Sequence, residues 1–308
     1  MRLAAIDIGT NSTKMTIADI TESGALTVVA EMSEVTRLGE GVDASKHLND
    51  AAMERTLEAI LRFAEEARRQ GAKEVLGAGT SALRDAANGQ FFLTEARSRA
   101  GVEIQIITGD REAQLAYAAV RSDSSLKLPL ESPLLVFDIG GGSTELILGD
   151  SSGVGRHKSL NIGAVRLTER FLHSDPPSLY ELDQATQFAR DAFETFPAPE
   201  SSPLVAGIGG TAINVASVMQ GLAKPDPDAV HATTLSHASV AEALSRFAHV
   251  PLADRRQIPG LEPKRADIIV AGALILDCLL SYFHADHFLL SARGLRYGLL
   301  ADHAKSLK

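Results

Sequence analysis

The sequence DIGTNST at residues 7–13 returns 131 residues later as DIGGGST at residues 138–144. An apolar run enters each copy and another apolar run leaves it. The flanks also match, because Asp19 aligns with Asp150 at the same offset. A repeat of such long period usually reflects a repeated structural unit. The sequence therefore predicts two related units.

Each copy predicts a β-hairpin, because a tight turn with glycine and Ser or Thr separates two apolar strands. The strands of the first hairpin are expected at residues 3–8 and 15–20, and the second hairpin at 134–149. Backbone N–H groups of such a turn can point at an anion. The aspartate that ends each entering strand is placed to hold a hydrated metal ion. Two such hairpins facing each other across a cleft would hold a phosphate chain from both sides.

Composition describes an ordinary globular protein of two domains. The chain has 308 residues, of which 45% are hydrophobic and 22% charged. Its one cysteine, Cys278, excludes a disulfide framework and a cysteine-rich metal site. The net charge of −9 argues against nucleic acid as a partner, since nucleic-acid binding needs a basic face. A polyanionic substrate stays compatible, because a cleft can be locally positive in an acidic protein.

No targeting or membrane segment is expected. The apolar stretch before Asp7 is too short for a signal peptide. Residues 266–283 are the most hydrophobic segment, but Asp267 and Asp277 interrupt it. It is interpreted as a buried helix and not as a membrane span. We therefore expect a cytoplasmic protein with no membrane partner.

Strand and helix patterns alternate along the first half of the chain, which favours an α/β fold. The polar stretch 121–127 predicts a division into domains 1–125 and 126–308, with the last helix, 294–308, packing back on the first domain. Further strands are expected at 26–32, 73–79, 103–107, 154–160, 203–208 and 287–291. Helices are expected at 51–69, 90–100, 110–121, 163–172, 179–195, 211–221, 237–248, 265–283 and 294–305.

Hydrolysis of a phosphoanhydride needs hydrogen-bond donors around the phosphoryl oxygens, a divalent metal and a carboxylate that orients water. The candidate donors lie in three glycine-containing segments: Gly9, Asn11, Ser12, Gly140, Gly141, Gly142, Ser143, Gly209, Gly210 and Thr211. Asp7, Asp138 and Glu145 supply the oxygen ligands that Mg²⁺ or Mn²⁺ prefers.

Several further segments occur in an order that is specific to one family. They are GTSALRDAAN at 79–88, ITGDREA at 107–113, SLNIGAVRLTE at 159–169, GIGGT at 207–211 and GLEPKRAD at 260–267. With the two hairpins, they resemble the exopolyphosphatase/guanosine pentaphosphate phosphohydrolase family, and the resemblance runs from Met1 to about Leu300. It implies two ribonuclease-H-like domains of the actin and sugar-kinase superfamily, with an interdomain cleft.

The resemblance also implies roles for individual residues. The family pattern Gly-x-x-Glu-Ala makes Glu112 the catalytic base, although a first-turn glutamate also stabilises a helix N-terminus. Arg84 matches a phosphate-binding arginine segment. Arg166 and Arg265 fit family motifs but could equally pack the domains. Lys14 stands where the family commonly has arginine, so bidentate phosphate geometry is lost there.

The expected function is release of orthophosphate from the end of inorganic polyphosphate. The C-terminal helical domains of long family members are missing, so short chains should be preferred. Guanosine pentaphosphate hydrolysis, the stringent-response activity of the family, is the nearest alternative. A sugar-kinase-like phosphotransferase and a non-catalytic polyphosphate or nucleotide sensor also stay open. The sequence leaves the oligomeric state undecided, with a homodimer as one option.

Overall fold

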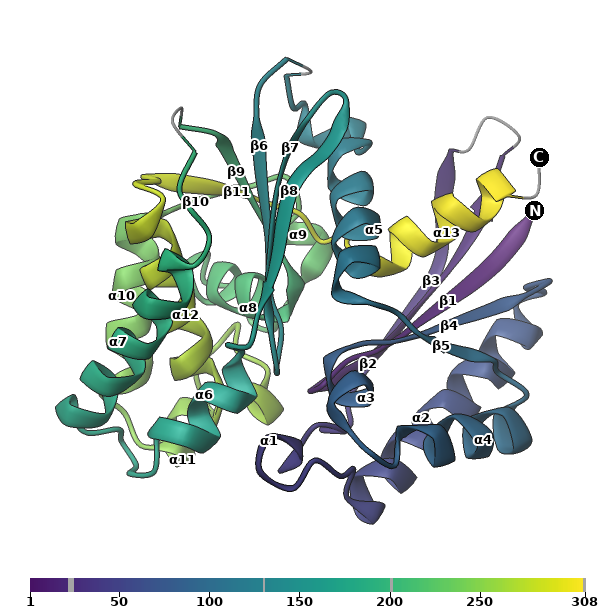
Figure 1. Cartoon of the computed structure of the whole chain (residues 1–308), viewed down its shortest axis with the longest axis horizontal. Coiled ribbons are helices and arrows are strands. Elements are labelled where there is room, and N and C mark those ends of the chain that lie inside the picture. Colours follow the sequence, from purple (N-terminus) through teal and green to yellow (C-terminus); the bar gives the residue numbers. More distant parts are fainter. Residues whose placement is uncertain (22–24, 130, 200–201, 307–308) are drawn as a thin grey trace. The chain divides into compact units, whose positions relative to one another are not determined.

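The computed structural model describes residues 1–21, 25–129, 131–199 and 202–306. The chain forms two compact units (Figure 1). The first comprises Met1–Ala119 and Arg293–Lys308, and the second comprises Val120–Ala292. The chain therefore passes between the units twice. The first passage comes after Ala119, a few residues before the division expected at 125.

The first unit is built on a five-stranded sheet of order β3-β2-β1-β4-β5. The hairpin partners β1 (Arg2–Ile8) and β2 (Ser12–Ile20) are antiparallel, as is β3 (Leu26–Val35) against β2. The strands β4 (Val75–Gly79) and β5 (Ile104–Ile106) extend the sheet in parallel. This is the strand order of a ribonuclease-H-like domain, and the predicted first hairpin is confirmed.

Helices cover both faces of the first sheet because alternate residues of β1 are apolar on both sides. Ala4 and Ile6 pack with α2 (Asp50–Arg69) and α4 (Gly89–Ala100). Leu3 and Ala5 face the other way and pack with Leu300 and Ala304 of α13 (Leu295–Ser306). Figure 1 shows α13 in yellow across the purple strands.

Short helices and α5 complete the first unit. They are α1 (Val42–Ser45), α3 (Ser81–Asp85) and α5 (Gly109–Arg121), whose last two residues belong to the second unit. The predicted helix start near residue 50 is confirmed, since the Asn49 side chain accepts hydrogen bonds from Ala51 and Ala52 N–H groups.

The second unit repeats this sheet order with one added strand. The order is β10-β11-β9-β6-β7-β8, so β8-β7-β6-β9-β11 corresponds to the whole first sheet. β6 and β7 form the second predicted hairpin, and β6 is parallel to β9. The strands are β6 (Leu134–Ile139), β7 (Thr144–Asp150), β8 (Gly153–Leu160), β9 (Leu204–Ile208), β10 (Thr234–Ser236) and β11 (His287–Leu290).

The most apolar helix, α12 (Ile269–Tyr282), lies at the centre of the second core, and Cys278 is buried in it. None of the helices in the described part of the chain is long and apolar enough to cross a bilayer. The other helices are α6 (Ala164–Phe171), α7 (Leu179–Glu194), α8 (Gly209–Met219), α9 (Pro227–Val230), α10 (His237–Ala248), α11 (Leu252–Arg255) and the 3₁₀ turns η1 (Ser124–Leu126) and η2 (Pro263–Arg265).

The prediction of one helix over 265–283 is wrong at its start. Residues 263–265 form the η2 turn, which begins at a proline and is capped by the Glu262 side chain, and α12 begins only at Ile269. A second contact holds residues 263–268: the buried Arg255 guanidinium donates to the carbonyl oxygens of Ala266 (3.0 Å) and Phe247 (2.7 Å). Tight turns therefore replace the first helical turn.

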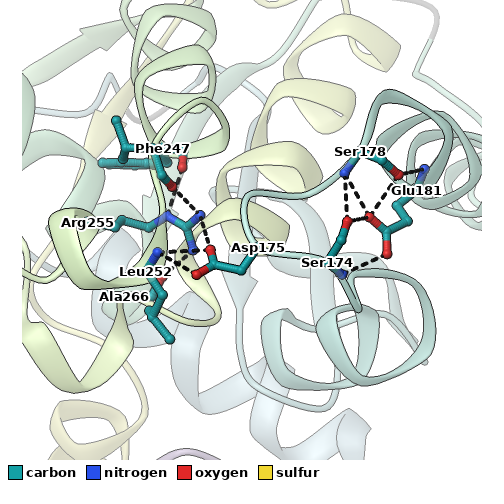
Figure 2. Close-up of polar contacts among 9 residues, drawn as sticks. Ser174, Asp175, Ser178, Glu181, Phe247, Leu252, Arg255 and Ala266 are labelled. Carbon is teal, nitrogen blue, oxygen red and sulfur yellow. Dashed lines mark hydrogen bonds and ion pairs between the residues drawn. The ribbon is translucent and has the colours of Figure 1, made fainter.

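Figure 2 shows how the loop before α7 is held to the same region. Asp175 accepts hydrogen bonds from the Leu252 N–H at 2.8 and 2.9 Å and lies 3.7 Å from Arg255. Burial lowers the pKa of Arg255, and the Asp175 carboxylate opposes that shift. Nearby, Ser178 and Glu181 form a capping box at the start of α7.

Candidate active site

The two glycine turns are closed by the same backbone hydrogen bond. The Gly9 N–H donates to the Ser12 carbonyl oxygen at 3.1 Å, and the Gly140 N–H donates to the Ser143 carbonyl oxygen at 2.9 Å. Both donors and both acceptors are separated by the 131-residue offset of the repeat. The sequence repeat is therefore also a repeat of turn geometry.

In the first turn the carbonyl groups of Thr10 and Asn11 accept hydrogen bonds, whereas their N–H groups donate none to the described residues. The Thr10 oxygen accepts from the Gly39 N–H and the Asn11 oxygen from the Arg37 N–H, both at 2.9 Å. Arg37 holds this position with a left-handed backbone (φ 54°). Among residues the structure describes, no acceptor faces the N–H groups of Thr10 or Asn11. Two adjacent N–H groups without an acceptor among the described residues can bind an anion.

The second turn has the same polarity. The Gly140 and Gly141 oxygens accept from the Ala164 and Val165 N–H groups, both at 2.9 Å, at the start of α6. The N–H groups of Gly141 and Gly142 have no acceptor within the described ranges. Gly163 is required here, because a Cβ at that position would lie 2.4 Å from the Gly141 oxygen. The start of α6 thus hydrogen-bonds the carbonyl groups of the turn, while the N–H groups of Gly141 and Gly142 stay available to a ligand.

Arg166 supports the second turn. Its side chain is 7% exposed, and its Nε donates to the Gly142 carbonyl oxygen at 2.7 Å. At least one guanidinium nitrogen is therefore committed to the turn backbone. This favours the packing interpretation that the sequence left open for Arg166.

The residues facing the two aspartates differ. Asp7 is in register with Lys14 across the first hairpin, whereas Asp138 is in register with Glu145 across the second. Burial raises the pKa of Asp7, and the charges of Lys14 and Arg296 oppose that shift. The first hairpin thus holds a compensated charge pair, and the second holds two acids.

Glu145 is buried and fixed by hydroxyl groups. It is 3% exposed, and its Oε1 accepts from Ser143 Oγ at 2.7 Å and Ser159 Oγ at 2.9 Å. Ser159 was not singled out from the sequence. Its position at the end of β8, in register with Glu145, was the signal that could have found it.

Asp138 lies against the start of α8. Gly209 has a left-handed backbone (φ 90°), and a Cβ there would lie 2.2 Å from Asp138 Oδ1. A carboxylate at a helix N-terminus is stabilised by the helix dipole. A glycine is therefore required at 209 both for its φ and for the space that Asp138 occupies.

Arg265 lies beside Gly210, where a Cβ would be 2.5 Å from its Nη1. Burial lowers the pKa of this guanidinium, while the charges of Glu262 and Asp138 oppose the shift. Asn214, which the sequence did not reveal, ties the two segments together: its Nδ2 donates to the Gly210 oxygen and its Oδ1 accepts from the Glu262 N–H, both at 2.8 Å. Arg265 is thus a neighbour of the acid pair.

Thr211, the last candidate donor of the segment 209–211, makes a hydrogen bond within the protein. The Thr211 hydroxyl donates to the Ile139 carbonyl oxygen at 3.2 Å, at the end of β6. Thr211 therefore holds α8 on the central strand, and its hydroxyl is not aimed away from the protein.

Glu112 and Arg84 are brought together in the first unit. Arg84 Nη1 donates to Glu112 Oε2 at 2.7 Å and to the Ile107 oxygen at 3.0 Å. The two side chains are 21% and 13% exposed, respectively. Glu112 lies in the first turn of α5, immediately after β5, as the sequence predicts. The predicted base and the predicted phosphate-binding arginine are thus direct partners.

The oxygen ligands for Mg²⁺ or Mn²⁺ fit only in part. Within the described ranges there is no group of three or more metal-ligating side chains. Asp138 and Glu145 form a pair in the second unit, and Asp7 belongs to the first. Two acids in register destabilise each other, so a cation between them would be favourable. In the first unit, the buried Asn11 Oδ1 has no hydrogen-bond partner among the described residues.

The predicted site residues are thus divided between the units. The first unit holds Asp7, Gly9, Asn11, Ser12, Lys14, Arg84 and Glu112. The second holds Asp138, Gly140, Gly141, Gly142, Ser143, Glu145, Arg166, Gly209, Gly210, Thr211 and Arg265. Each unit thus contains one glycine turn and its own set of candidate residues.

Comparison with known proteins gives a consistent result. The profile of the Ppx/GppA phosphatase family matches residues 16–307. Exopolyphosphatase 2 of Mycobacterium tuberculosis is 34% identical over 90% of this chain and 89% of its own length. The bifunctional 3-dehydroquinate synthase/phosphatase of Fusobacterium nucleatum is 33% identical over 97% of this chain, which spans 46% of that longer protein.

Solved structures agree on the fold. The Ppx/GppA family member of Aquifex aeolicus superposes with a TM-score of 0.83 at 31% identity, covering 100% of this chain and 99% of that one. The predicted fold class, two α/β units of the ribonuclease-H-like, actin-related type, is confirmed.

Proposed function

Because this chain belongs to the Ppx/GppA phosphatase family, we propose that it is an exopolyphosphatase that hydrolyses the terminal phosphoanhydride of inorganic polyphosphate. It is a hydrolase of phosphoanhydride bonds, as its relatives named exopolyphosphatases are. The observation that carries the proposal is the half-buried Glu112 carboxylate, which accepts a hydrogen bond from Arg84 at 2.7 Å. The same unit contains the turn in which the N–H groups of Thr10 and Asn11 have no acceptor among the described residues.

The outward N–H groups of the two turns, at Thr10, Asn11, Gly141 and Gly142, are the proposed donors to phosphate oxygens. Such fixed donors stabilise the charge that spreads over the equatorial oxygens in the transition state. They need no reorganisation, because their carbonyl groups are already held by neighbouring backbone. Polyphosphate, which offers only phosphate oxygens, is a suitable ligand for them.

Glu112 is the proposed general base. Its carboxylate takes a proton from water, the water oxygen bonds to the terminal phosphorus, and the bond from that phosphorus to the bridging oxygen breaks. Orthophosphate leaves, and the shortened chain keeps the bridging oxygen. Arg84 holds Glu112 in one orientation, and a terminal phosphate would draw some of the guanidinium hydrogen bonds to itself.

Asp138 and Glu145 are the residues we propose to hold Mg²⁺ or Mn²⁺. A bound divalent ion would neutralise charge that develops on the phosphate oxygens. The hydroxyl groups of Ser143 and Ser159 keep the Glu145 carboxylate in place, and Gly209 leaves room for Asp138. Glu112 in the first unit and this acid pair in the second make both units necessary for activity.

We further propose a preference for short polyphosphate. The net charge of −9 repels a long polyanion, and the guanidinium groups of Arg84 and Arg166 are already bonded within their own units. Beyond the roughly 10 Å Debye length at 0.1 M salt, little attraction remains to retain a long chain between cuts. Distributive cleavage follows.

The test is phosphate release by purified protein from tripolyphosphate, long polyphosphate, guanosine pentaphosphate and ATP, with and without Mg²⁺. We expect the highest kcat/KM for tripolyphosphate and a product ladder that shortens gradually from the long polymer. Phosphate release from guanosine pentaphosphate alone would identify that nucleotide, and not polyphosphate, as the substrate. No release from any of the four would refute the enzyme assignment.

A further inference from the structure

One side chain touches both stretches of chain that connect the two units. The chain leaves the first unit after Ala119, at the end of α5, and returns to it after Ala292, between β11 and α13. His231, which follows α9, bonds to both stretches on the side of the second unit.

The contact to the return passage uses Nδ1. The Ala292 N–H lies 3.1 Å from His231 Nδ1. A backbone N–H can only donate, so Nδ1 is the unprotonated nitrogen of the ring. A neutral imidazole then carries its hydrogen on Nε2.

The contact to the outgoing passage uses Nε2. It lies 2.7 Å from Ser125 Oγ and 3.3 Å from Asp123 Oδ2, in and before the η1 turn that follows α5. Ser125 in turn donates its N–H (3.0 Å) and its hydroxyl (2.6 Å) to Asp123 Oδ1. Because the serine hydroxyl donates to the carboxylate, it accepts the Nε2 hydrogen. Every donor in this set has an acceptor.

Backbone hydrogen bonds hold the segment that carries His231. Its N–H donates to the Pro227 oxygen at 3.0 Å, and its neighbour Ala232 donates to the Leu290 oxygen of β11 at 2.9 Å. Leu290 donates back to the Thr233 oxygen at 2.8 Å. The His231 side chain is 14% exposed and the Asp123 side chain 1% exposed, so the contact between them is largely sheltered from water, whereas Ser125 is exposed.

We propose that His231 is a positioning residue for hydrolysis: it joins the η1 turn, which follows the end of α5, to the return passage, and thereby fixes the C-terminal end of α5. The proposal rests on the proposed function, because α5 carries Glu112 in its first turn. The helix rises roughly 14 Å from Glu112 to Arg121, so tilting at its end displaces the carboxylate. Misplacement of a reacting group by about 1 Å can cost on the order of 10²-fold in rate.

The two halves of the contact can be separated by substitution. His231→Gln places an amide donor near the Nε2 position and keeps the bond to the η1 turn. His231→Asn places an acceptor near the Nδ1 position and keeps the bond to Ala292. His231→Ala removes both. His249→Ala is the control, since His249 is exposed and bonds only to Ser245 of its own helix.

The experiment measures kcat and KM for tripolyphosphate per folded molecule, together with amide hydrogen exchange at Ser125 and Ala292. We expect His231→Ala to lower kcat by about 10- to 100-fold with KM changed less than about twofold. His231→Gln should recover more of kcat than His231→Asn, because the η1 turn continues from α5. The His249→Ala control should match the parent.

Equal kcat in parent and His231→Ala would overturn the proposal, as would equal kcat in the Gln and Asn variants if His231→Ala does not fold. The exchange readout separates this result from a failure of the proposed function. If the parent released no phosphate, faster exchange at both amides in His231→Ala would still support the role of His231 in fixing the passages. Unchanged exchange would overturn that role.

Discussion

The strand-end aspartate of the first hairpin faces a lysine, whereas its counterpart in the second hairpin faces a glutamate. Around this difference the two turns are alike. Each is closed by the same N–H to carbonyl bond, and each leaves two N–H groups without an acceptor in the described residues. The duplicated backbone thus supplies two similar pairs of N–H donors, which are the proposed phosphate sites.

The residue opposite the strand-end aspartate, Lys14 or Glu145, distinguishes the proposed phosphate site of the first hairpin from the proposed metal site of the second. Lys14 compensates Asp7 within the first unit, which leaves that turn suited to a phosphate. Asp138 faces Glu145 instead of a lysine, with Arg265 as a charged neighbour, and two carboxylates in register suit a cation. The first unit also contains the Glu112 and Arg84 pair, so the proposed base and the proposed metal ligands come from different units.

The largest expected effect concerns the base. Glu112→Gln should lower kcat by about 10²–10⁴-fold with little change in KM, because proton acceptance is lost and the side-chain shape is kept. Asp110→Asn is the matched control, an exposed acid in the same helical turn. Steady-state kinetics on tripolyphosphate measures both, and a Glu112→Gln enzyme with parental kcat would refute the role.

The next effect tests what is particular to the second unit. Gly209→Ala should destabilise the fold by about 1–3 kcal/mol, because the residue holds φ 90° and its Cβ would lie 2.2 Å from Asp138 Oδ1. Urea unfolding measures the loss, and kcat should fall with it since the Asp138 carboxylate must move. A variant as stable and active as the parent would show that Asp138 does not occupy this space.

A smaller effect tests the likeness of the two turns. In Gly9→Ala the new Cβ would meet the Ser12 oxygen at 3.0 Å, and in Gly140→Ala it would meet the Ser143 oxygen at 3.1 Å. The two variants should therefore lose similar amounts of stability, within about 0.5 kcal/mol of each other. A clear difference in their urea midpoints would mean that the turns are not equivalent.

Much of this arrangement is predictable from the sequence. The repeat predicted both hairpins, and the strand expected at 103–107 before a helix at 110–121 placed Glu112 in the first turn of that helix. The contacts that decide the roles of Arg84 and Arg166 were not predictable, because each depends on a carbonyl or carboxylate distant in sequence. Asn214 was missed for the same reason, since a polar side chain within an apolar helix carries no sign of its partner. Ser159 can be found only by pairing the strand expected at 154–160 with the second hairpin, which sets it opposite Glu145.

The smallest effect is a pH dependence in the first unit. Burial raises the pKa of Asp7 in the folded protein, so ionised Asp7 opposes folding. As pH rises from the ordinary carboxyl range near 4 through the folded-state pKa, stability is lost, and above that pKa the loss stays constant. Asp7→Asn should therefore be more stable than the parent at neutral pH, and the gain should vanish in acid. Urea midpoints across pH measure it; a pH-independent difference would contradict it.

Mn²⁺ binding tests the separation of roles between the two hairpins most directly. The fraction of bound ion is obtained from the loss of the free Mn²⁺ electron paramagnetic resonance signal in titrations of the parent, Asp138→Asn, Glu145→Gln and Asp7→Asn. We predict that the variants of the second hairpin weaken binding by at least about tenfold. Asp7→Asn should bind within about threefold of the parent, since Lys14 faces that carboxylate. Binding that is lost equally in Asp7→Asn, or kept in Asp138→Asn and Glu145→Gln, would contradict the account.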